Sequence, residues 1–317
     1  MYLHRGAPFL SLGRSINGTF LVTPVYLHRG ATNFALGNDT LTLFVHGKVH
    51  AVTSFSVAYV SGLDGHYTTV VTTSASKSAI LHFNKQLTAN SWSGLSGNQA
   101  SSFSVPTTGM YWVTARVVPV SFDVVIRVTT ENSTSNRILF DVWGEKGRSV
   151  SCSGAFRLSA GTVVKVKTTI RATYTSGTMM SFVYLEGNRK LYTGPDEHIA
   201  FTGTVKKNLW NNNHRLIPFL HHLTNYGRLH VPDGAISIRK SGSYMISLRS
   251  DPPANATTKI DVLVNGRFKR KFISRMGVPS GQTISLVLKA KDQIKVINHM
   301  THYFENGTLF SIAFLRR

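Results

Sequence analysis

The stretch that decides the fold is Phe103-Ser104-Val105-Pro106-Thr107-Thr108-Gly109-Met110-Tyr111, which leads into an alternating run from Trp112 to Val118. An apolar edge enters a turn whose glycine can adopt positive φ, and the tyrosine two residues later opens a strand. The same arrangement returns at Ile236-Ser237-Ile238-Arg239-Lys240-Ser241-Gly242-Ser243-Tyr244, just before Met245 to Leu248. Two copies of one signature indicate a repeated β unit.

Around these copies, period-two alternation is widespread and helical periodicity is nearly absent. In Val164-Lys165-Val166-Lys167, for example, valines and lysines fall on opposite faces of a strand. The pair Asn265-Gly266 favours a tight type I′ hairpin turn. Three closing strands carry aromatic pairs expected in the same kind of core: Phe55 with Tyr59, Phe182 with Tyr184, and Phe310 with Phe314. The sequence therefore predicts an all-β protein of antiparallel sandwiches or barrels.

Composition limits the classes to which the chain can belong. Its 317 residues carry 35 Lys and Arg against 14 Asp and Glu, a formal net charge of +21, and 42% are hydrophobic. That length allows two or three domains, and that hydrophobicity argues against disorder. The single cysteine, Cys152, excludes an intrachain disulfide framework and a CxxC zinc site. We expect neither a signal peptide nor a transmembrane helix, because no apolar stretch has the required form.

The order of these elements resembles the C1q/TNF-like jelly-roll superfamily, whose pattern combines F-x-x-P-x-x-G-x-Y with an inner strand pair and a closing strand centred on Phe. Residues 76–188 match this pattern, and residues 189–317 match it with Arg239 at the proline position. The structural motif comprises Phe103, Pro106, Gly109, Tyr111, Phe182, Gly242, Tyr244 and Phe310. The resemblance implies tandem jelly-roll sandwiches that pack as trimers through one apolar face. Partners would then be other protein subunits of an assembly, and three modules on one chain could form a pseudo-trimer.

Residues 1–75 fit only the latter half of such a module, from about Phe20 to Ser61. We expect a partial jelly-roll-like β unit there. A partner chain could supply the missing strands, the region could be a smaller β unit, or the native chain could begin earlier. An unpaired half-sandwich exposes strand edges, which natural proteins avoid, so completion by another chain or a neighbouring module is favoured.

The sequence contains few residues in patterns typical of catalytic or metal sites. Only Asp196 and Glu197 are adjacent carboxylates, and no G-x-S-x-G elbow, Walker loop or H-E-x-x-H motif occurs. Cys152 would act as a nucleophile only with a lowered pKa. A histidine cluster comprises His214, His221, His222 and His230. It lacks the converging acids or thiols of a zinc site. We predict a non-enzymatic protein without catalytic residues, metal or cofactor.

The strongest charge signal is segment 259–275, where six cations accompany one acid, Asp261. With a hairpin tip at Asn265-Gly266, alternation places Arg267, Lys269 and Lys271 on one strand face, and Phe268, Arg270 and Phe272 on the other. The predicted partner-binding basic surface comprises Lys259, Arg267, Lys269, Arg270, Lys271, Arg275, Lys206 and Lys207. It is either a solvated face or a docking surface for an acidic protein, nucleic acid, sulfated glycan or anionic lipid. No base-reading motif occurs, which argues against sequence-specific nucleic-acid recognition.

Two functions remain open. The first is a structural assembly protein, as a minor capsid, cement or spike-base component of a virion, because a basic, nearly cysteine-free chain of jelly rolls suits a particle built in a reducing compartment. The second is a secreted C1q-type recognition or extracellular-matrix protein that binds acidic glycans or surfaces. Five N-x-S/T triplets, at Asn17, Asn38, Asn132, Asn255 and Asn306, support the second.

Overall fold

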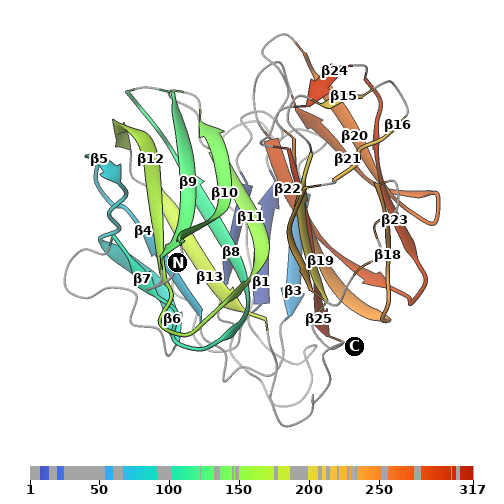
Figure 1. The fold of residues 1–317 in the computed structure, drawn as a ribbon, viewed down its shortest axis with the longest axis horizontal. Coiled ribbons are helices and arrows are strands. Elements are labelled where there is room, and N and C mark those ends of the chain that lie inside the picture. Colours follow the sequence, from blue (N-terminus) through green and yellow to red (C-terminus); the bar gives the residue numbers. More distant parts are fainter. Residues whose placement is uncertain are drawn as a thin grey trace.

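The computed structural model describes residues 8–13, 20–24, 54–59, 67–90, 101–185 and 199–316, the last two ranges with short gaps. Within these ranges the chain consists of β-strands and contains no α-helix (Figure 1). Accordingly, the described residues include no helix that is long and apolar enough to span a membrane. All strand pairs are antiparallel, which confirms the predicted all-β fold class. The strands described form two sandwiches, one small three-stranded sheet and one separate pair of strands.

The first sandwich contains two sheets of five strands. Its inner sheet has the order β11-β8-β13-β4-β6, and its outer sheet has the order β10-β9-β12-β5, with β7 also paired to β12. The inner strands are β4 (Tyr67–Val71), β6 (Lys85–Asn90), β8 (Gly109–Val117), β11 (Val150–Leu158) and β13 (Met179–Tyr184). The outer strands are β5 (Ser76–Ile80), β7 (Phe103–Ser104), β9 (Val124–Glu131), β10 (Asn136–Gly144) and β12 (Val163–Tyr174).

The second sandwich repeats this arrangement strand for strand. Its inner sheet has the order β17-β14-β25-β19-β22, and its outer sheet has the order β16-β23-β20-β21, with β18 also paired to β23. The inner strands are β14 (Ala200–Thr204), β17 (His221–Tyr226), β19 (Gly242–Ser250), β22 (Ser280–Leu288) and β25 (Leu309–Arg316). The outer strands are β16 (Arg215–Leu216), β18 (Ala235–Ser237), β20 (Thr258–Val264), β21 (Arg267–Ser274) and β23 (Gln293–Asn298). A separate pair joins β15 (Leu209–Asn211) to β24 (His302–Phe304).

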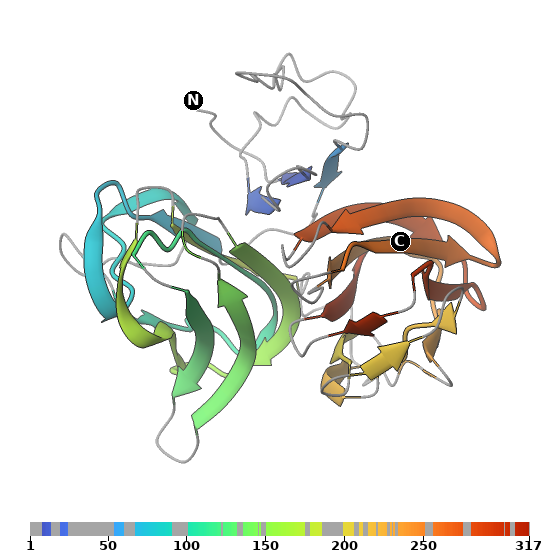
Figure 2. The same ribbon diagram turned by 90° about the horizontal axis from the view of Figure 1, so that it is seen from above.

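A third, small sheet has the order β2-β1-β3 and lies at the junction of the two sandwiches (Figure 2). Its strands are β1 (Pro8–Gly13), β2 (Phe20–Pro24) and β3 (Ser54–Tyr59). Strand β4 belongs to the first sandwich because it pairs with β13. From the sequence, residues 67–71 are instead assigned to the N-terminal unit of residues 1–75. The alternation of residues within β4 does not predict which strand it pairs with, because its partner lies more than a hundred residues later in the chain.

The motif that defines the repeat has the same structural role in both sandwiches. The Tyr111 hydroxyl donates a hydrogen bond to the Thr107 carbonyl at 2.7 Å, and the Tyr244 hydroxyl donates to the Lys240 carbonyl at 2.6 Å. Each ring also packs against an aromatic residue of the closing strand, with centroids 5.1 Å and 5.2 Å apart. Burial raises the pKa of Tyr244 to about 12. The tyrosine therefore ties the entry turn to the core.

Each sandwich has its own apolar core between its two sheets. Phe103, Tyr111 and Phe182 lie in the first core, and Tyr244 and Phe310 lie in the second. All five side chains are fully buried. Burial of this kind contributes about 25 cal/mol per Å² of apolar surface. The aromatic residues of the two closing strands are thus core residues, as predicted.

Candidate interaction surfaces

The outer sheet of the second sandwich presents a cationic face to solvent. Strand β20 contributes the residues that alternate with buried Ile260 and Val262. The residues of β21 and β23 that pair with them lie on the same face. We call the outer basic face the surface made by Lys259, Leu263, Phe268, Lys271 and Lys295. Lys259 and Lys271 are exposed, Leu263 and Lys295 are half-buried, and Phe268 is 57% exposed.

A β-bulge alters the face assignment that strict alternation predicts. Val262 pairs with Arg270 and Leu263 pairs with Phe268, so Lys269 has no opposite residue in the ladder. The extra residue returns Phe268 to the same face as Lys271, whose Nζ lies 5.9 Å from the Phe268 ring centroid. The expectation that Phe268 lies with Phe272 is therefore wrong.

Arg267 and Lys269 flank the outer basic face as exposed residues of the hairpin. Arg270 instead pairs with core-facing Val262 and is half-buried, and desolvation by burial lowers the pKa of its guanidinium. The predicted basic surface thus divides between two sides of the hairpin. Arg275, Lys206 and Lys207 lie outside the described residues.

The outer basic face also contains one acid, Asp261, which alternates with Ile260 and Val262 along β20 and is directly opposite Lys271. Asp261 Oδ2 lies 2.8 Å from His299 Nε2, and the Asp261 side chain is 12% exposed. Asp292 accepts hydrogen bonds from the Asn265 side-chain amide and the Lys289 backbone N–H, both at 2.7 Å. Within the described part of the chain, Lys259, Lys271 and Lys295 form no ion pair.

The outer sheet of the first sandwich has equivalent residue positions, but these positions carry different charges. Its bulge lies at Leu139, so register makes Asp141 equivalent to Lys271 and Lys165 equivalent to Lys295. Arg127 donates to both carboxylate oxygens of Asp141 at 2.8 Å.

Glu131 completes this neutralisation. Its carboxylate accepts hydrogen bonds from Lys165 and Lys167, which lower its pKa. The residue equivalent to Glu131 in the second sandwich is Asn265, whose side chain holds the turn at Asp292. Asp141 and Glu131 of the first sandwich are therefore replaced by Lys271 and Asn265 in the second, while Arg127 is replaced by Asp261. Sequence reasoning missed Lys295, although alternation in Gln293-Ile294-Lys295-Val296 places it on this face.

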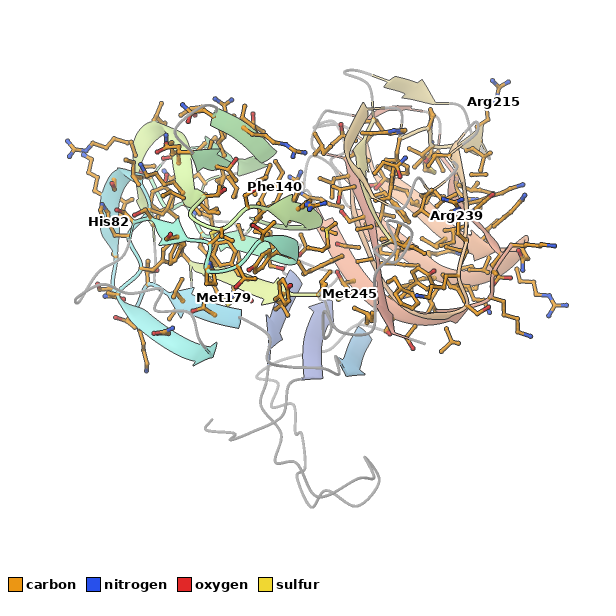
Figure 3. All side chains as sticks on the ribbon, turned by 60° about the horizontal axis from the view of Figure 1, so that its bottom comes forward. His82, Phe140, Met179, Arg215, Arg239 and Met245 are labelled. Carbon is orange, nitrogen blue, oxygen red and sulfur yellow. The ribbon has the colours of Figure 1, made fainter. Side chains whose placement is uncertain are left out.

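A second candidate surface joins the two sandwiches through their inner sheets. Its apolar part comprises Met110, Trp112, Ala155, Val183 and Leu185 of the first sandwich, and Ala200, Met245, Ala313 and Leu315 of the second. Met245 lies between the two bodies (Figure 3). Every one of these side chains is at most 8% exposed. The outward face of each inner sheet is thus an interface within the chain.

Other predicted candidates do not gather into a site. Burial raises the pKa of the Cys152 thiol far above its ordinary value, which opposes a nucleophilic role. His222 is exposed and packs its ring against Phe201, whereas the side chains of His214, His221 and His230 lie outside the described set. The described residues contain no group of three or more His, Cys, Asp or Glu that could hold a metal ion. The asparagines of all five N-x-S/T triplets are outside the described residues.

No protein-family model and no curated protein matches the chain. Among solved structures, murine APRIL is 22% identical over 38% of this chain and 99% of its own, with a TM-score of 0.32. The globular domain of zebrafish complement 1qA is 14% identical over 39% of this chain and 99% of its own, with a TM-score of 0.32. Vertex protein P5 of PRD1 is 12% identical over 37% of this chain and 93% of its own, with a TM-score of 0.26.

Strand topology gives the fold independently of these scores. Each sandwich pairs an inner sheet with an outer sheet in the same strand order, and each carries the turn, tyrosine and closing strand on which the sequence resemblance rests. The prediction is confirmed at the level of fold: the chain contains two tandem antiparallel jelly-roll sandwiches.

Proposed function

We propose that this protein is a non-enzymatic structural protein of an assembly, a minor capsid, cement or spike-base component of a virion, that docks to acidic neighbours through the outer basic face. The observation that carries the proposal is the difference between two equivalent sheets. One neutralises its cations with Asp141 and Glu131, and the other leaves Lys259, Lys271 and Lys295 without carboxylate partners among the described residues.

Physical chemistry favours docking over a solvated face. Lys259, Lys271 and Lys295 share one face, and none of them is directly opposite another lysine in the ladder. An acidic neighbour gains Coulomb energy with these cations, and its docking becomes faster and more specific. Phe268 adds an exposed apolar anchor beside Lys271.

A polyanion-binding experiment tests the docking surface directly. The probe is dextran sulfate, titrated at several salt concentrations with the unaltered chain and with the triple variant Lys259→Gln, Lys271→Gln and Lys295→Gln. We expect the variant to bind more weakly and with a smaller salt slope, because fewer counterions are released when fewer cations are neutralised. Equal affinities and slopes would show that this face is only solvated.

Matched variants of the first sandwich supply the controls. Lys165→Gln removes a cation that is already neutralised, so its effect should be small. Glu131→Gln frees both Lys165 and Lys167 and should strengthen binding of dextran sulfate. A decrease with Glu131→Gln would contradict the role given to neutralisation.

A test of the biological setting requires protein isolated from its natural source. We expect the natural protein to be recovered from purified particles with unmodified asparagines. The triple variant should be incorporated less efficiently than the unaltered chain at low salt, and the difference should shrink as salt rises. Recovery as a secreted protein with glycan mass at Asn132 or Asn255 would favour the alternative, a C1q-type recognition or matrix protein that binds acidic glycans.

A further inference from the structure

Three trios of strands in this chain have the same order, direction and register. In the first sandwich, Thr114 of β8 is opposite Ser153 of β11 and Ser181 of β13. In the second, Ser247 of β19 is opposite Thr283 of β22 and Ser311 of β25.

The small N-terminal sheet supplies the third trio. Ser11 of β1 is opposite Val22 of β2 and Ser56 of β3. The closing strands agree in sequence as well, because Phe55-Ser56-Val57-Ala58-Tyr59 parallels Phe310-Ser311-Ile312-Ala313-Phe314. Strands β1, β2 and β3 therefore correspond to β19, β22 and β25. In the sequence, β1 and β2 are separated only by positions 14–19, whereas β20 and β21 lie between β19 and β22.

These trios contact one another in a closed cycle. Strand β11 of the first sandwich packs on β14 and β25 of the second. Strand β22, its equivalent in the second sandwich, packs on β1 and β3. Strand β2, the equivalent in the small sheet, packs on β4, β8 and β13 of the first sandwich. Each edge strand thus lies on the face of the next unit, and the third contact returns to the first.

One joint of the cycle shows how an edge strand is covered. The Thr202 hydroxyl accepts a hydrogen bond from the Ala155 backbone N–H at 3.1 Å and lies 3.2 Å from the Ala155 carbonyl. The Ser311 hydroxyl lies 3.0 Å from Thr202 Oγ1 and 3.3 Å from the Ser153 carbonyl. Hydroxyl side chains on the face of one unit therefore satisfy backbone groups on the open edge of another.

We propose that the chain is an intramolecular trimer in which β1, β2 and β3 form a reduced third unit, and that this unit occupies the inner faces on which a further copy would otherwise dock. Head-to-tail contacts of this kind close into a ring when the rotation between units is right. Here the ring closes within one chain. The proposal does not rest on the outer basic face, which lies on the opposite side of the second sandwich.

Sedimentation of the unaltered chain gives the first test. We expect one species of 34.9 kDa at every concentration, because all three positions are filled by one chain. Under the same conditions, amides of β1, β2 and β3 should be protected from hydrogen exchange. A stable trimer of chains, or rapid exchange throughout β1 to β3, would overturn the proposal.

Two charged variants on one strand give the second test. Thr283 of β22 is 3% exposed on the face that meets the small sheet, whereas Val287 on the same face is 81% exposed. Thr283→Arg should speed exchange in β1 to β3 by tenfold or more and make the protein self-associate, while Val287→Arg should change neither. A folded Thr283→Arg protein with unchanged exchange and unchanged mass would refute the third unit. If that variant does not fold, the measurements on the unaltered chain still decide.

Discussion

At the scale of single residues, the two sandwiches have different residues at one equivalent turn position. The Gly161 N–H donates to the Val105 carbonyl at 2.8 Å, and the Lys291 N–H donates to the Ile238 carbonyl at 2.7 Å, so the two residues occupy equivalent positions. Both have left-handed backbones, with φ of 78° and 73°. That conformation costs an L-residue roughly 1–2 kcal/mol, and glycine adopts it freely. The second sandwich therefore carries strain that the first avoids.

Exchanging these residues should move stability in opposite directions. Lys291→Gly should raise the free energy of unfolding by about 0.5–1 kcal/mol, because released strain exceeds the entropic cost of glycine. Gly161→Lys should lower it by about 1 kcal/mol, since no atom lies within 4 Å of the added Cβ and only backbone strain acts. Urea denaturation measures both changes. A loss of stability with Lys291→Gly would contradict this account.

At the scale of elements, the edge of β11 is bonded by two side chains of the other sandwich, Thr202 and Ser311. Thr202 is fully buried and holds both backbone groups of Ala155. Thr69 occupies the equivalent place in the first sandwich, opposite Ser181 as Thr202 is opposite Ser311, and its hydroxyl lies 3.1 Å from the Ser181 hydroxyl. One threonine thus bridges two sandwiches, and the other is bonded within one sheet.

This difference predicts unequal effects of the same substitution. Thr202→Val leaves the buried Ala155 N–H and carbonyl without their partner, which costs about 1–3 kcal/mol for unsatisfied groups. Thr69→Val removes one hydroxyl pair and should cost about 1 kcal/mol. Thermal unfolding of the two variants gives the comparison. A larger loss with Thr69→Val would show that the bridge to β11 contributes little.

At the scale of the whole molecule, a buried apolar cluster joins the inner sheets of the two sandwiches, so we expect the sandwiches to unfold cooperatively. Ala313 is fully buried, and it belongs with Trp112 and Met245 to the apolar cluster that joins the two sandwiches. A charge at this position would have to leave water without a partner, which costs several kcal/mol. The same charge at the exposed end of β22, at Val287, remains in water.

Calorimetry should reveal the coupling. Unaltered protein and Val287→Glu should unfold in one transition, whereas Ala313→Glu should separate into two transitions because each sandwich keeps its own core. In the Ala313→Glu variant, the free energy of unfolding of the joined sandwiches should fall by on the order of 3 kcal/mol or more. One sharp transition in Ala313→Glu, at an unchanged temperature, would show that the sandwiches do not stabilise each other.

The sequence alone determined the features that depend on neighbours along the chain. Alternation identified the strands, Asn265-Gly266 located a hairpin tip, and Tyr111 and Tyr244 marked the repeat, because strand geometry and turn sterics act over a few residues. The basic segment was also visible, since charge is additive along the chain.

Tertiary structure decided the features that depend on register between distant strands. The bulge at Lys269 moved Phe268 to the cationic face, and the exchange of Glu131 for Asn265 became visible only when two sheets were aligned by their pairing. The place of the small sheet likewise follows from contacts of β1, β2 and β3 with strands far away in sequence. Alternation specifies which residues of a strand share a face, but only the partner strand specifies which face is covered and which charge is neutralised.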